Sequence, residues 1–437
     1  MSIKNVLIVG GGFGGLHVAK GLGNQTGLHI QLIDRRNYHL FQPLLYQIAM
    51  AGLSPADIAA PLRSILSPFK NAEVFLGNVE HVDLKLRKVR TSFASLSYDY
   101  LVLACGAKHS YFGRNEWEEF APGLKTLEQA TEIRRRVFLA YEKAERETNS
   151  DKQKESLTFI IVGGGPTGVE LAGALGEISR FTLNQDFRHI DPKRTKIILI
   201  EAGSRILPSF SEKLSSQATR DLEALGVTVW TSSKVTEISS NGVQVGAEFI
   251  RAGTVLWAAG VQPSSLGKDL GVSLDAVGRV VVQKDLSVLN YSQVFVIGDQ
   301  AACLDESGRS LPGLAPVAMQ QGNFVARSIL RDLKGKPREV FRYRDKGQMA
   351  TIGRRKAIAQ TAGLQFSGFL AWMAWLLIHI YYLIGFKNRL FVLMQWTWSY
   401  FTFKRGARLI VNKEWRSNQI SHKPNHDQNV SAEREKP

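Results

Sequence analysis

The sequence predicts an α/β protein with two Rossmann-like dinucleotide-binding domains and a C-terminal amphipathic helical module that docks on a membrane. Three observations lead to this fold class. A strand–glycine–helix motif opens the chain, a second copy begins at residue 156, and an apolar, Trp-rich segment lies near the C-terminus. The length of 437 residues suits two or three domains.

The first motif reads KNVLIVGGGFGGLHVAKGL, residues 4–22. Gly10 permits a tight turn, Gly12 lets the backbone approach a pyrophosphate, and Gly15 lets helix and strand pack closely. The phosphate would bind the free N–H groups at the helix N-terminus. The next strand, HIQLIDRR, ends at Asp34, where an acid accepts hydrogen bonds from a ribose diol. This order of elements predicts a dinucleotide site.

The second motif, SLTFIIVGGGPTGVELAGAL, places Gly163, Gly165 and Gly168 at the same spacing. The following strand, KIILIEAGSRIL, ends at Glu201. An acid at this position favours NADH, because it repels the 2′-phosphate of NADPH. Arg205 follows closely and weakens that preference.

Two nucleotide folds without a separate substrate fold indicate a flavin in one and a nicotinamide in the other. The apolar strand NYSQVFVIGDQAA, residues 290–302, is expected to return to the first fold and to bring Asp299 to the flavin's ribityl chain. LVLACGA (101–107) and VLWAAGV (255–261) are expected to close the two folds. The predicted parts are an FAD-binding domain (1–120 and 276–335), an inserted NADH-binding domain (121–275), the C-terminal module (336–412), and a polar tail (413–437) expected to be disordered.

Charge and cysteine content narrow the partners. The formal net charge is +16, and residues 336–437 hold 18 Lys and Arg against 6 Asp and Glu. Basic charge mixed with Trp and aliphatic residues favours a membrane surface over nucleic acid.

Cys105 and Cys303 are the only cysteines, which excludes a disulfide scaffold and a cysteine-rich metal site; both are expected to be packing residues. No signal peptide precedes the first strand, so an intracellular location is expected.

The stretch GFLAWMAWLLIHIYYLIGFKNR, residues 368–389, is long and apolar. A helix over 366–385 has two faces. Its aliphatic stripe holds Phe366, Leu370, Met373, Leu377, Ile380 and Ile384, whereas Gly368, Ala371, Trp375, His379 and Tyr382 lie opposite and are expected to pack on the FAD domain. A second amphipathic segment follows at 390–402. We interpret the pair as helices that lie on a membrane; a single spanning helix and a core or subunit-contact role remain alternatives.

Three less common stretches carry a resemblance to a known family. They are NYHLFQPLLYQIAMAGLSPADIAAPLR (37–63), PGLAPVAMQQG (312–322) and YRDKGQMATIGRRKAIA (343–359). With them the chain resembles the bacterial type II NADH:quinone oxidoreductases, also called alternative NADH dehydrogenases. The resemblance implies a single-subunit, non-proton-pumping enzyme of the respiratory chain. It would pass a hydride from NADH to non-covalent FAD and two electrons on to a membrane quinone such as ubiquinone, as a peripheral protein on the cytoplasmic face of the inner membrane.

The resemblance also implies site residues. FAD would be held by Gly10, Gly12, Phe13, Gly14, Gly15, Asp34, Arg35, Val79, Asp299, Ala318, Met319 and Lys387. NADH would be held by Gly163, Gly165, Thr167, Gly168, Glu201 and Gly260. Quinone-side candidates are Tyr46, Pro316, Gln320, Gln321 and His379. Pro316 departs from the family, which often has a glutamine there.

Glu170 directly follows the second glycine motif and is the candidate catalytic residue. A carboxylate in the first helical turn would stabilise the helix dipole by about 0.3–1 kcal/mol. By resemblance, Glu170 would instead project between nicotinamide and flavin, orienting the nicotinamide or relaying protons, and we favour that role. His39 is a weaker proton-donor candidate and is expected to be a packed or surface residue. No metal-ligand spacing stands out.

Two other functions were weighed. Sulfide:quinone oxidoreductase shares this architecture but requires cysteines that face the flavin, and Cys105 and Cys303 lie in the wrong segments. A redox-sensing or electron-carrier module would pass electrons to an acidic, ferredoxin-like protein through the basic C-terminal quarter. Membrane lipids and the quinone pool are the expected partners, and a homodimer is possible.

Overall fold

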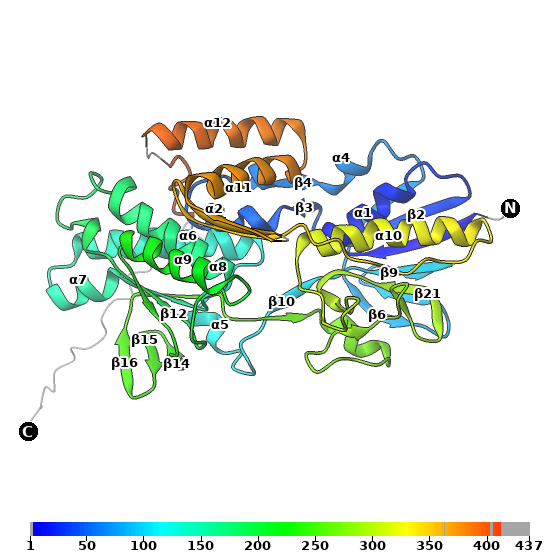
Figure 1. The fold of residues 1–437 in the computed structure, drawn as a ribbon, viewed down its shortest axis with the longest axis horizontal. Coiled ribbons are helices and arrows are strands. Elements are labelled where there is room, and N and C mark those ends of the chain that lie inside the picture. Colours follow the sequence, from blue (N-terminus) through cyan, green and yellow to red (C-terminus); the bar gives the residue numbers. More distant parts are fainter. Residues whose placement is uncertain (1–2, 362, 403–404, 412–437) are drawn as a thin grey trace, which may run out of the picture.

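The computed structural model describes residues 3–361, 363–402 and 405–411, and within them two α/β folds lie side by side beneath a smaller C-terminal unit (Figure 1). The predicted tail, residues 413–437, lies outside the described residues. We call the two α/β parts the first fold and the second fold, in chain order.

The first fold is built on a six-stranded sheet whose apolar strands are covered on both faces. α1 and α10 pack together on one face, and a small antiparallel sheet covers the other. Near-continuous apolar strands such as KNVLIV are typical of parallel sheets that are buried on both sides. In spatial order the strands are β20 (Ser287–Val288), β21 (Tyr291–Val296), β9 (Tyr100–Leu103), β1 (Lys4–Val9), β2 (Leu28–Asp34) and β5 (Ala72–Leu76). The covering elements are α1 (Phe13–Leu22), α10 (Ala315–Leu333), β6 (Val79–Asp83), β7 (Lys88–Thr91) and β8 (Ser95–Ser97).

The late strand returns to the first fold as the sequence predicts. β21 pairs in parallel with β9, with Val294 beside Leu101. The polypeptide therefore completes this sheet only after it has built the second fold. Two short antiparallel strands, β10 (Ala107–His109) and β18 (Val261–Pro263), carry the chain out and back.

The second fold repeats the design with a four-stranded parallel sheet. Its strands are, in spatial order, β13 (Val227–Trp230), β12 (Lys196–Ile200), β11 (Thr158–Val162) and β17 (Thr254–Trp257). Its helices are α6 (Leu127–Arg146), α7 (Ser150–Ser156), α8 (Pro166–Glu177) and α9 (Glu212–Ala224), and a small sheet is formed by β14 (Val235–Ser239), β15 (Gly242–Val245) and β16 (Glu248–Arg251).

Short elements of the first fold and the connecting segments are β3 (Tyr38–Leu40), α2 (Leu45–Ala49), α3 (Pro55–Ile58), β4 (Ala59–Pro61), α4 (Leu62–Leu66), α5 (Trp117–Phe120), β19 (Val280–Val281) and β22 (Ala301–Ala302).

The C-terminal unit contains a three-stranded antiparallel sheet that the sequence did not predict. It consists of β23 (Gln348–Gly353), β24 (Lys356–Thr361) and β25 (Leu364–Ser367), followed by α11 (Phe369–Tyr382) and α12 (Phe386–Thr402). The predicted helix over 366–385 was therefore too long at both ends. Phe366 pairs with Ala359 in the sheet, and Gly368, at φ +74°, breaks the chain before the helix starts.

The two faces predicted for this helix are confirmed in part, because Ile380 and Ile384 of the aliphatic stripe pack against the core. The surface beneath the helix also differs from the prediction. Ala371 and Trp375 are buried, whereas Leu370 and Leu377 are 70% and 60% exposed. The buried face packs mainly on β23–β25 and reaches the first fold through His379, whose ring lies 6.2 Å from that of Phe41. The sheet supplies the apolar surface that the prediction assigned to the FAD domain.

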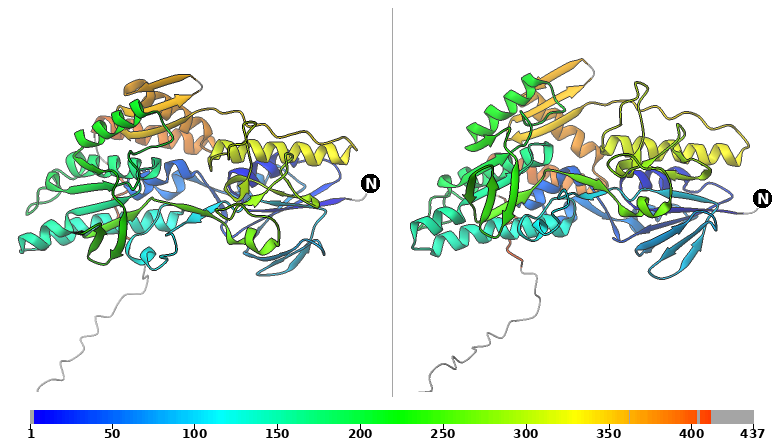
Figure 2. Two further views of the ribbon diagram at one scale, coloured as in Figure 1. Left: turned by 60° about the horizontal axis from the view of Figure 1, so that its bottom comes forward. Right: turned by 90° about the horizontal axis from the view of Figure 1, so that it is seen from below.

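A close helix–strand contact joins the C-terminal unit to the second fold. α8 packs against β23. Both views in Figure 2 show the strands of the C-terminal unit beside helices of the second fold. A Cβ atom on Gly173 would lie 1.7 Å from the carbonyl oxygen of Ile352, so only glycine fits at this crossing. The position of α11 and α12 over the rest of the molecule depends on this contact.

Gly173→Ala should therefore destabilise the protein, although glycine-to-alanine changes inside helices usually stabilise by about 1 kcal/mol. The new methyl group must push β23 away, and overpacking of this kind costs about 1–3 kcal/mol. Thermal or urea unfolding of the FAD-loaded protein measures the change. Gly406→Ala is the matched control, because its Cβ would meet nothing within 4 Å. Equal stability of the two variants would contradict the contact.

Candidate active site

The first glycine motif forms a loop that tolerates no side chain at its contact points. A Cβ on Gly15 would lie 1.9 Å from the Gly10 oxygen, and one on Gly10 would lie 2.4 Å from the Ala104 oxygen. Gly10 also adopts φ +104°, which favours glycine. A Cβ on Gly12, in contrast, would meet nothing within 4 Å. The loop is therefore closed toward the sheet and open toward solvent at the helix N-terminus.

The second motif has the same geometry. A Cβ on Gly168 would lie 1.9 Å from the Gly163 oxygen, Gly163 adopts φ +108°, and Gly165 is open. Both motifs thus present free N–H groups at a helix N-terminus, where the helix dipole attracts phosphate.

In each fold, backbone amides orient the carboxylate of the acid that ends the strand after the glycine loop. Asp34 accepts hydrogen bonds from the amides of Gly11 (2.6 Å) and Arg36 (2.7 Å). Glu201 accepts from Gly164 (2.6 Å) and Gly203 (2.7 Å). A carboxylate has about four acceptor positions, so each acid retains capacity for a ribose diol.

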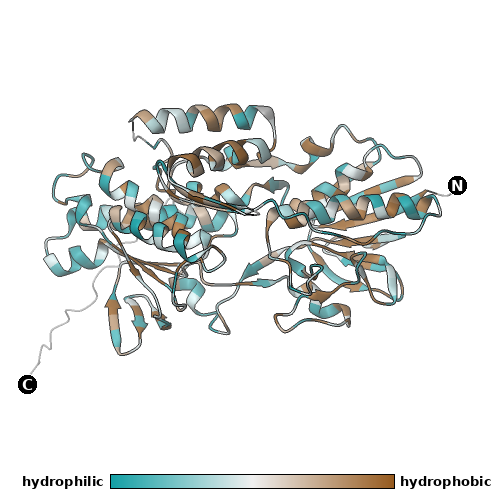
Figure 3. Ribbon diagram, viewed as in Figure 1, coloured by the Kyte–Doolittle hydropathy of each residue, from teal (hydrophilic) through white to brown (hydrophobic). Residues whose placement is uncertain are grey.

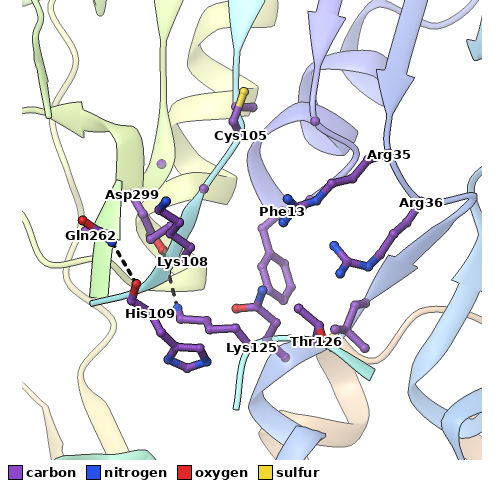
Figure 4. Close-up of a pocket in the computed structure, with 18 of the residues that line it drawn as sticks. Phe13, Arg35, Arg36, Cys105, Lys108, His109, Lys125, Thr126, Gln262 and Asp299 are labelled. Carbon is purple, nitrogen blue, oxygen red and sulfur yellow. Dashed lines mark hydrogen bonds and ion pairs between the residues drawn. The ribbon is translucent and has the colours of Figure 1, made fainter. Parts of the chain in front are cut away.

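A cavity of about 790 Å³ runs along the first glycine loop. Besides the glycines it is lined by Phe13, Asp34, Arg35, Asp299 and Ala318 (Figure 4). A neighbouring cavity of about 380 Å³ shares Asp34 and Arg35 with it and adds Val79. Both cavity volumes lie in the range of about 300–1,000 Å³ that is usual for ligand and cofactor sites. Size, open N–H groups and the oriented acid together fit FAD.

Two polar groups in this cavity were not predicted. The Lys125 ammonium lies 3.9 Å from the Asp299 carboxylate (Figure 4), and Gln262 donates to the carbonyl oxygen of His109. Both residues come from connecting segments without a motif. Cys105 also lines the cavity, but burial raises the pKa of its thiol to about 12, so it is a neutral packing group, as predicted. Cys303 is buried as well.

A second cavity, of about 850 Å³, lies where the two folds and the C-terminal unit meet. It adjoins the first cavity, because Phe13, Gln42, Lys125 and Asp299 line both. The second fold contributes Thr167 and Glu170; the first fold contributes Tyr46, Pro316 and Met319; and the C-terminal unit contributes Leu377, His379 and Tyr382. Most of the predicted residues therefore converge on two connected cavities.

Glu170 lies in the second turn of α8 rather than the first, because the helix begins at Pro166. The helix-dipole explanation for this acid is therefore wrong. Glu170 lines the second cavity and also a smaller one of about 110 Å³ on its other side. Burial raises the pKa of its carboxyl to about 8, only partly offset by the Thr351 backbone amide. The carboxyl is consequently protonated at neutral pH.

Tyr46 lines the same two cavities as Glu170. Burial, with a smaller contribution from Glu170, raises the pKa of its hydroxyl well above the ordinary value. The hydroxyl accepts a 2.9 Å hydrogen bond from Gln47, which in turn accepts one of 2.7 Å from the Trp396 indole. Gln47, which the sequence did not single out, thus connects α12 to the cavity wall.

The two histidines singled out in the sequence are neutral. Burial lowers the pKa of His379 to about 4, and its Nδ1 lies 2.6 Å from the Trp375 carbonyl oxygen. Burial also lowers the pKa of His39 to about 4, with Nδ1 3.0 Å from the Gly11 oxygen. His39 is a packed residue that supports the glycine loop, as predicted.

The other quinone-side and flavin-side candidates have different surroundings. Gln320 exchanges two hydrogen bonds with the backbone of Arg344, and the buried Gln321 accepts from the Gly298 amide. Lys387 lies with its ammonium 5.8 Å from the Phe391 ring. Lys346, which was not predicted, lines the second cavity and donates to the Tyr382 hydroxyl at 2.9 Å.

Arg205 is held within its own loop. Its guanidinium donates to the carbonyl oxygens of Phe210 (2.7 Å) and Pro208 (2.9 Å) and to the Ser215 hydroxyl (2.8 Å). These hydrogen bonds hold the guanidinium within its own loop.

The comparisons agree with this geometry. Residues 4–322 match the family model described as pyridine nucleotide-disulphide oxidoreductase, and residues 346–405 match the NDH2 C-terminal domain. The type II NADH:quinone oxidoreductase Ndh of Mycobacterium tuberculosis is 41% identical over 425 residues, which cover 94% of this chain and 90% of the relative. That of Staphylococcus aureus (strain NCTC 8325) is 31% identical over 375 residues, covering 84% and 91%.

Solved structures share the fold. NDH2 from Plasmodium falciparum in complex with NADH superposes with a TM-score of 0.84 at 18% identity, covering 94% of this chain and all of that one. The sulfide:quinone oxidoreductase of Aquifex aeolicus gives 0.70 at 21% identity, covering 88% and 91%.

Two paired nucleotide folds with these glycine loops define a pyridine nucleotide-disulphide oxidoreductase. Within that class, the identity over nearly the whole chain and the C-terminal domain show that the protein belongs to the type II NADH:quinone oxidoreductases. The alternative of a sulfide:quinone oxidoreductase is set aside on this ground.

Proposed function

We propose that the two connected cavities are where electrons pass from NADH to a membrane quinone. As a type II NADH:quinone oxidoreductase, the protein oxidises NADH and reduces a quinone. Bound FAD supplies the two-electron chemistry that links the two half-reactions. The observation that carries the proposal is the second cavity, because it joins residues of both nucleotide folds to residues of the C-terminal unit and also adjoins the first cavity.

The first cavity is assigned to FAD. Gly12, Gly14 and Gly15 present the helix N-terminus to the pyrophosphate, and Asp34 binds the ribose. Asp299, held by Lys125, approaches the ribityl chain, while Ala318 and Met319 lie at the start of α10 near the ring. Lys387 has the least structural support among the residues proposed for FAD, because its ammonium lies over the Phe391 ring.

The second fold is assigned to NADH, with Gly165, Thr167, Gly168 and Gly260 around the cofactor and Glu201 on the adenosine ribose. The orientation of Glu201 by two amides supports a preference for NADH over NADPH, because the fixed negative charge repels a 2′-phosphate.

Glu201→Gln should shift this preference. The amide retains an oxygen for the Gly164 N–H but removes the charge, so the ratio of kcat/KM for NADPH to that for NADH should rise about tenfold or more, the effect of about 1.4 kcal/mol. Ferricyanide reduction with each cofactor measures it. Glu212→Gln, on the exposed start of α9, is the control. A ratio that stays within twofold of the control would contradict the assignment of Glu201.

Glu170 is assigned to proton transfer between the second cavity and the smaller cavity on its other side. Reduction of a quinone takes up protons as well as electrons. A carboxyl that is protonated below about pH 8 can donate one at neutral pH and regain it afterwards. Tyr46 lies in the same walls and holds its own proton more tightly.

Glu170→Gln should slow reoxidation of the flavin by quinone by about tenfold or more, because general acid catalysis contributes about 10²–10⁴-fold. In the parent, this step should fall as pH rises through about 8, where Glu170 ionises, and the variant should lack that transition. Stopped-flow absorbance of each half-reaction gives the rates. Reoxidation by ferricyanide, which takes no proton, should not change. The role fails if quinone reoxidation matches the parent within about twofold across the pH range.

The C-terminal unit is assigned to binding at a membrane surface, with quinone entering from the lipid past α11. No helix among the described residues is long and apolar enough to cross a bilayer. α11 has 14 residues, which span about 21 Å against a hydrocarbon core of about 30 Å. Figure 3 shows hydrophobic residues along much of α11 and at intervals along α12. The large apolar side chains exposed on the two helices are Phe369, Leu370, Leu377, Ile378, Tyr381, Leu390, Phe391, Leu393, Met394, Trp398 and Phe401. Patches of this kind mark interaction surfaces.

Leu370→Glu combined with Phe401→Glu should release the protein from vesicles that contain anionic lipid. Each large apolar side chain contributes about 1.5–3 kcal/mol when it is fully buried, so the partition coefficient should fall about tenfold or more. Sedimentation with vesicles measures it, and NADH:ferricyanide activity should persist. Leu86→Glu, a similarly exposed leucine of the first fold at 68%, is the control. Equal binding of variant and control would contradict the surface.

A further inference from the structure

The two folds are internal copies, so corresponding positions can be compared. Gly10 packs against Ala104 and Cys105 after β9, and Gly163 packs against Ala258 and Ala259 after β17. Gly106, the next residue in the first fold, lines the cavity assigned to FAD. Its counterpart in the second fold is Gly260. Gly260 should therefore border the place of NADH.

An aromatic side chain lies at that border. A Cβ on Gly260 would be 2.8 Å from the ring carbon Cζ of Phe112. The Phe112 ring also meets the edge of the Trp257 ring, with centroids 6.0 Å apart at 64°. The residue is nevertheless 68% exposed. Phe112 thus lies beside the segment that closes the second glycine loop, with most of its surface in solvent.

The backbone around Phe112 is held in an unfavourable conformation. Phe112 adopts φ +52°, and Gly113 follows at φ +91°. A positive φ is uncommon for a bulky residue, and such strain tends to be retained at functional sites. Exposure of a large apolar ring adds a second cost. Neither the strained backbone nor the exposed ring is compensated by packing of Phe112 in the protein core.

The loop is nevertheless firmly attached to the second fold on both sides of Phe112. The Ser110 amide donates to the Gly260 oxygen at 3.1 Å, and the Trp257 indole donates to the Ser110 oxygen at 2.9 Å. On the other side, Arg114 forms a 2.6 Å ion pair with Glu237 of β14. These contacts fix the direction in which the Phe112 side chain projects, so its exposure follows from the structure of the loop.

We propose that Phe112 is a positioning residue for NADH: its ring covers the bound dinucleotide at Gly260 and stacks on it from the solvent side. The inference rests on the proposed assignment of NADH to the second fold. Stacking would hold the cofactor in place without taking part in electron transfer. Its loss should therefore raise KM for NADH and leave kcat unchanged.

The test compares Phe112→Ala, Phe112→Leu and Phe112→Tyr in the FAD-loaded full chain, with ferricyanide as acceptor so that the quinone side does not limit the rate. Alanine and leucine should raise KM for NADH, and the dissociation constant of NAD⁺ measured by titration, by about 3- to 10-fold, the factor expected for an aromatic stack. Tyrosine keeps the ring and should restore parental values. Phe249→Ala is the control, since Phe249 is an exposed phenylalanine of β16 in the same fold.

A KM for NADH in Phe112→Ala that equals that of Phe249→Ala overturns the proposal. A Phe112→Leu protein with parental values overturns the stacking role. Gly165→Val tests the underlying assignment separately, because its side chain would project from the open face of the second glycine loop. Retained reduction of the flavin by NADH in Gly165→Val would refute the NADH site itself, whatever Phe112 does.

Discussion

The close approach of α8 to β23 is the contact on which the arrangement of the whole protein depends. Gly173 leaves no room for a side chain between the helix and the Ile352 carbonyl. One turn before this contact, Glu170 faces two cavities, and one turn after it, Glu177 pairs with Arg405 at 2.9 Å and accepts from the Arg354 amide. A single helix therefore carries the glycine loop assigned to NADH at its start, the proton-transfer candidate in its middle and the anchor of the C-terminal unit at its end.

That geometry explains how the nucleotide-binding folds and the proposed membrane-docking surface could share one site. The sheet β23–β25 rests on α8 and carries α11 across the second cavity, where Leu377, His379 and Tyr382 complete its wall. The outward faces of α11 and α12 remain apolar and exposed. In the proposed docking on a membrane, residues that line the site on one side would meet lipid on the other.

The sequence predicted the parts whose signals are local. Glycine spacing, apolar strands and the acids Asp34 and Glu201 follow from one turn, one helix and one strand each, and the structure has the same order. The sheet β23–β25 was missed, because its short strands pack against α8, which is distant in the chain, as well as against α11, which follows them directly. Glu170 was assigned one turn too early, since Pro166 starts the helix immediately after the glycines. Gln47 and Lys346 lie within stretches that carry the family resemblance but were not singled out there, and Lys125 comes from a segment without a motif. Only the folded chain brings these three residues to the cavities.

The central claim is that one bound flavin receives electrons from NADH and gives them to a quinone that arrives through lipid. It is tested most directly by anaerobic rapid mixing of the unaltered protein, first with NADH and then with vesicles that hold a long-chain quinone. Flavin absorbance should bleach in the first step and recover fully in the second, at a rate no slower than steady-state turnover. A flavin that NADH bleaches and ferricyanide restores, but that the vesicle quinone leaves reduced, would contradict the account.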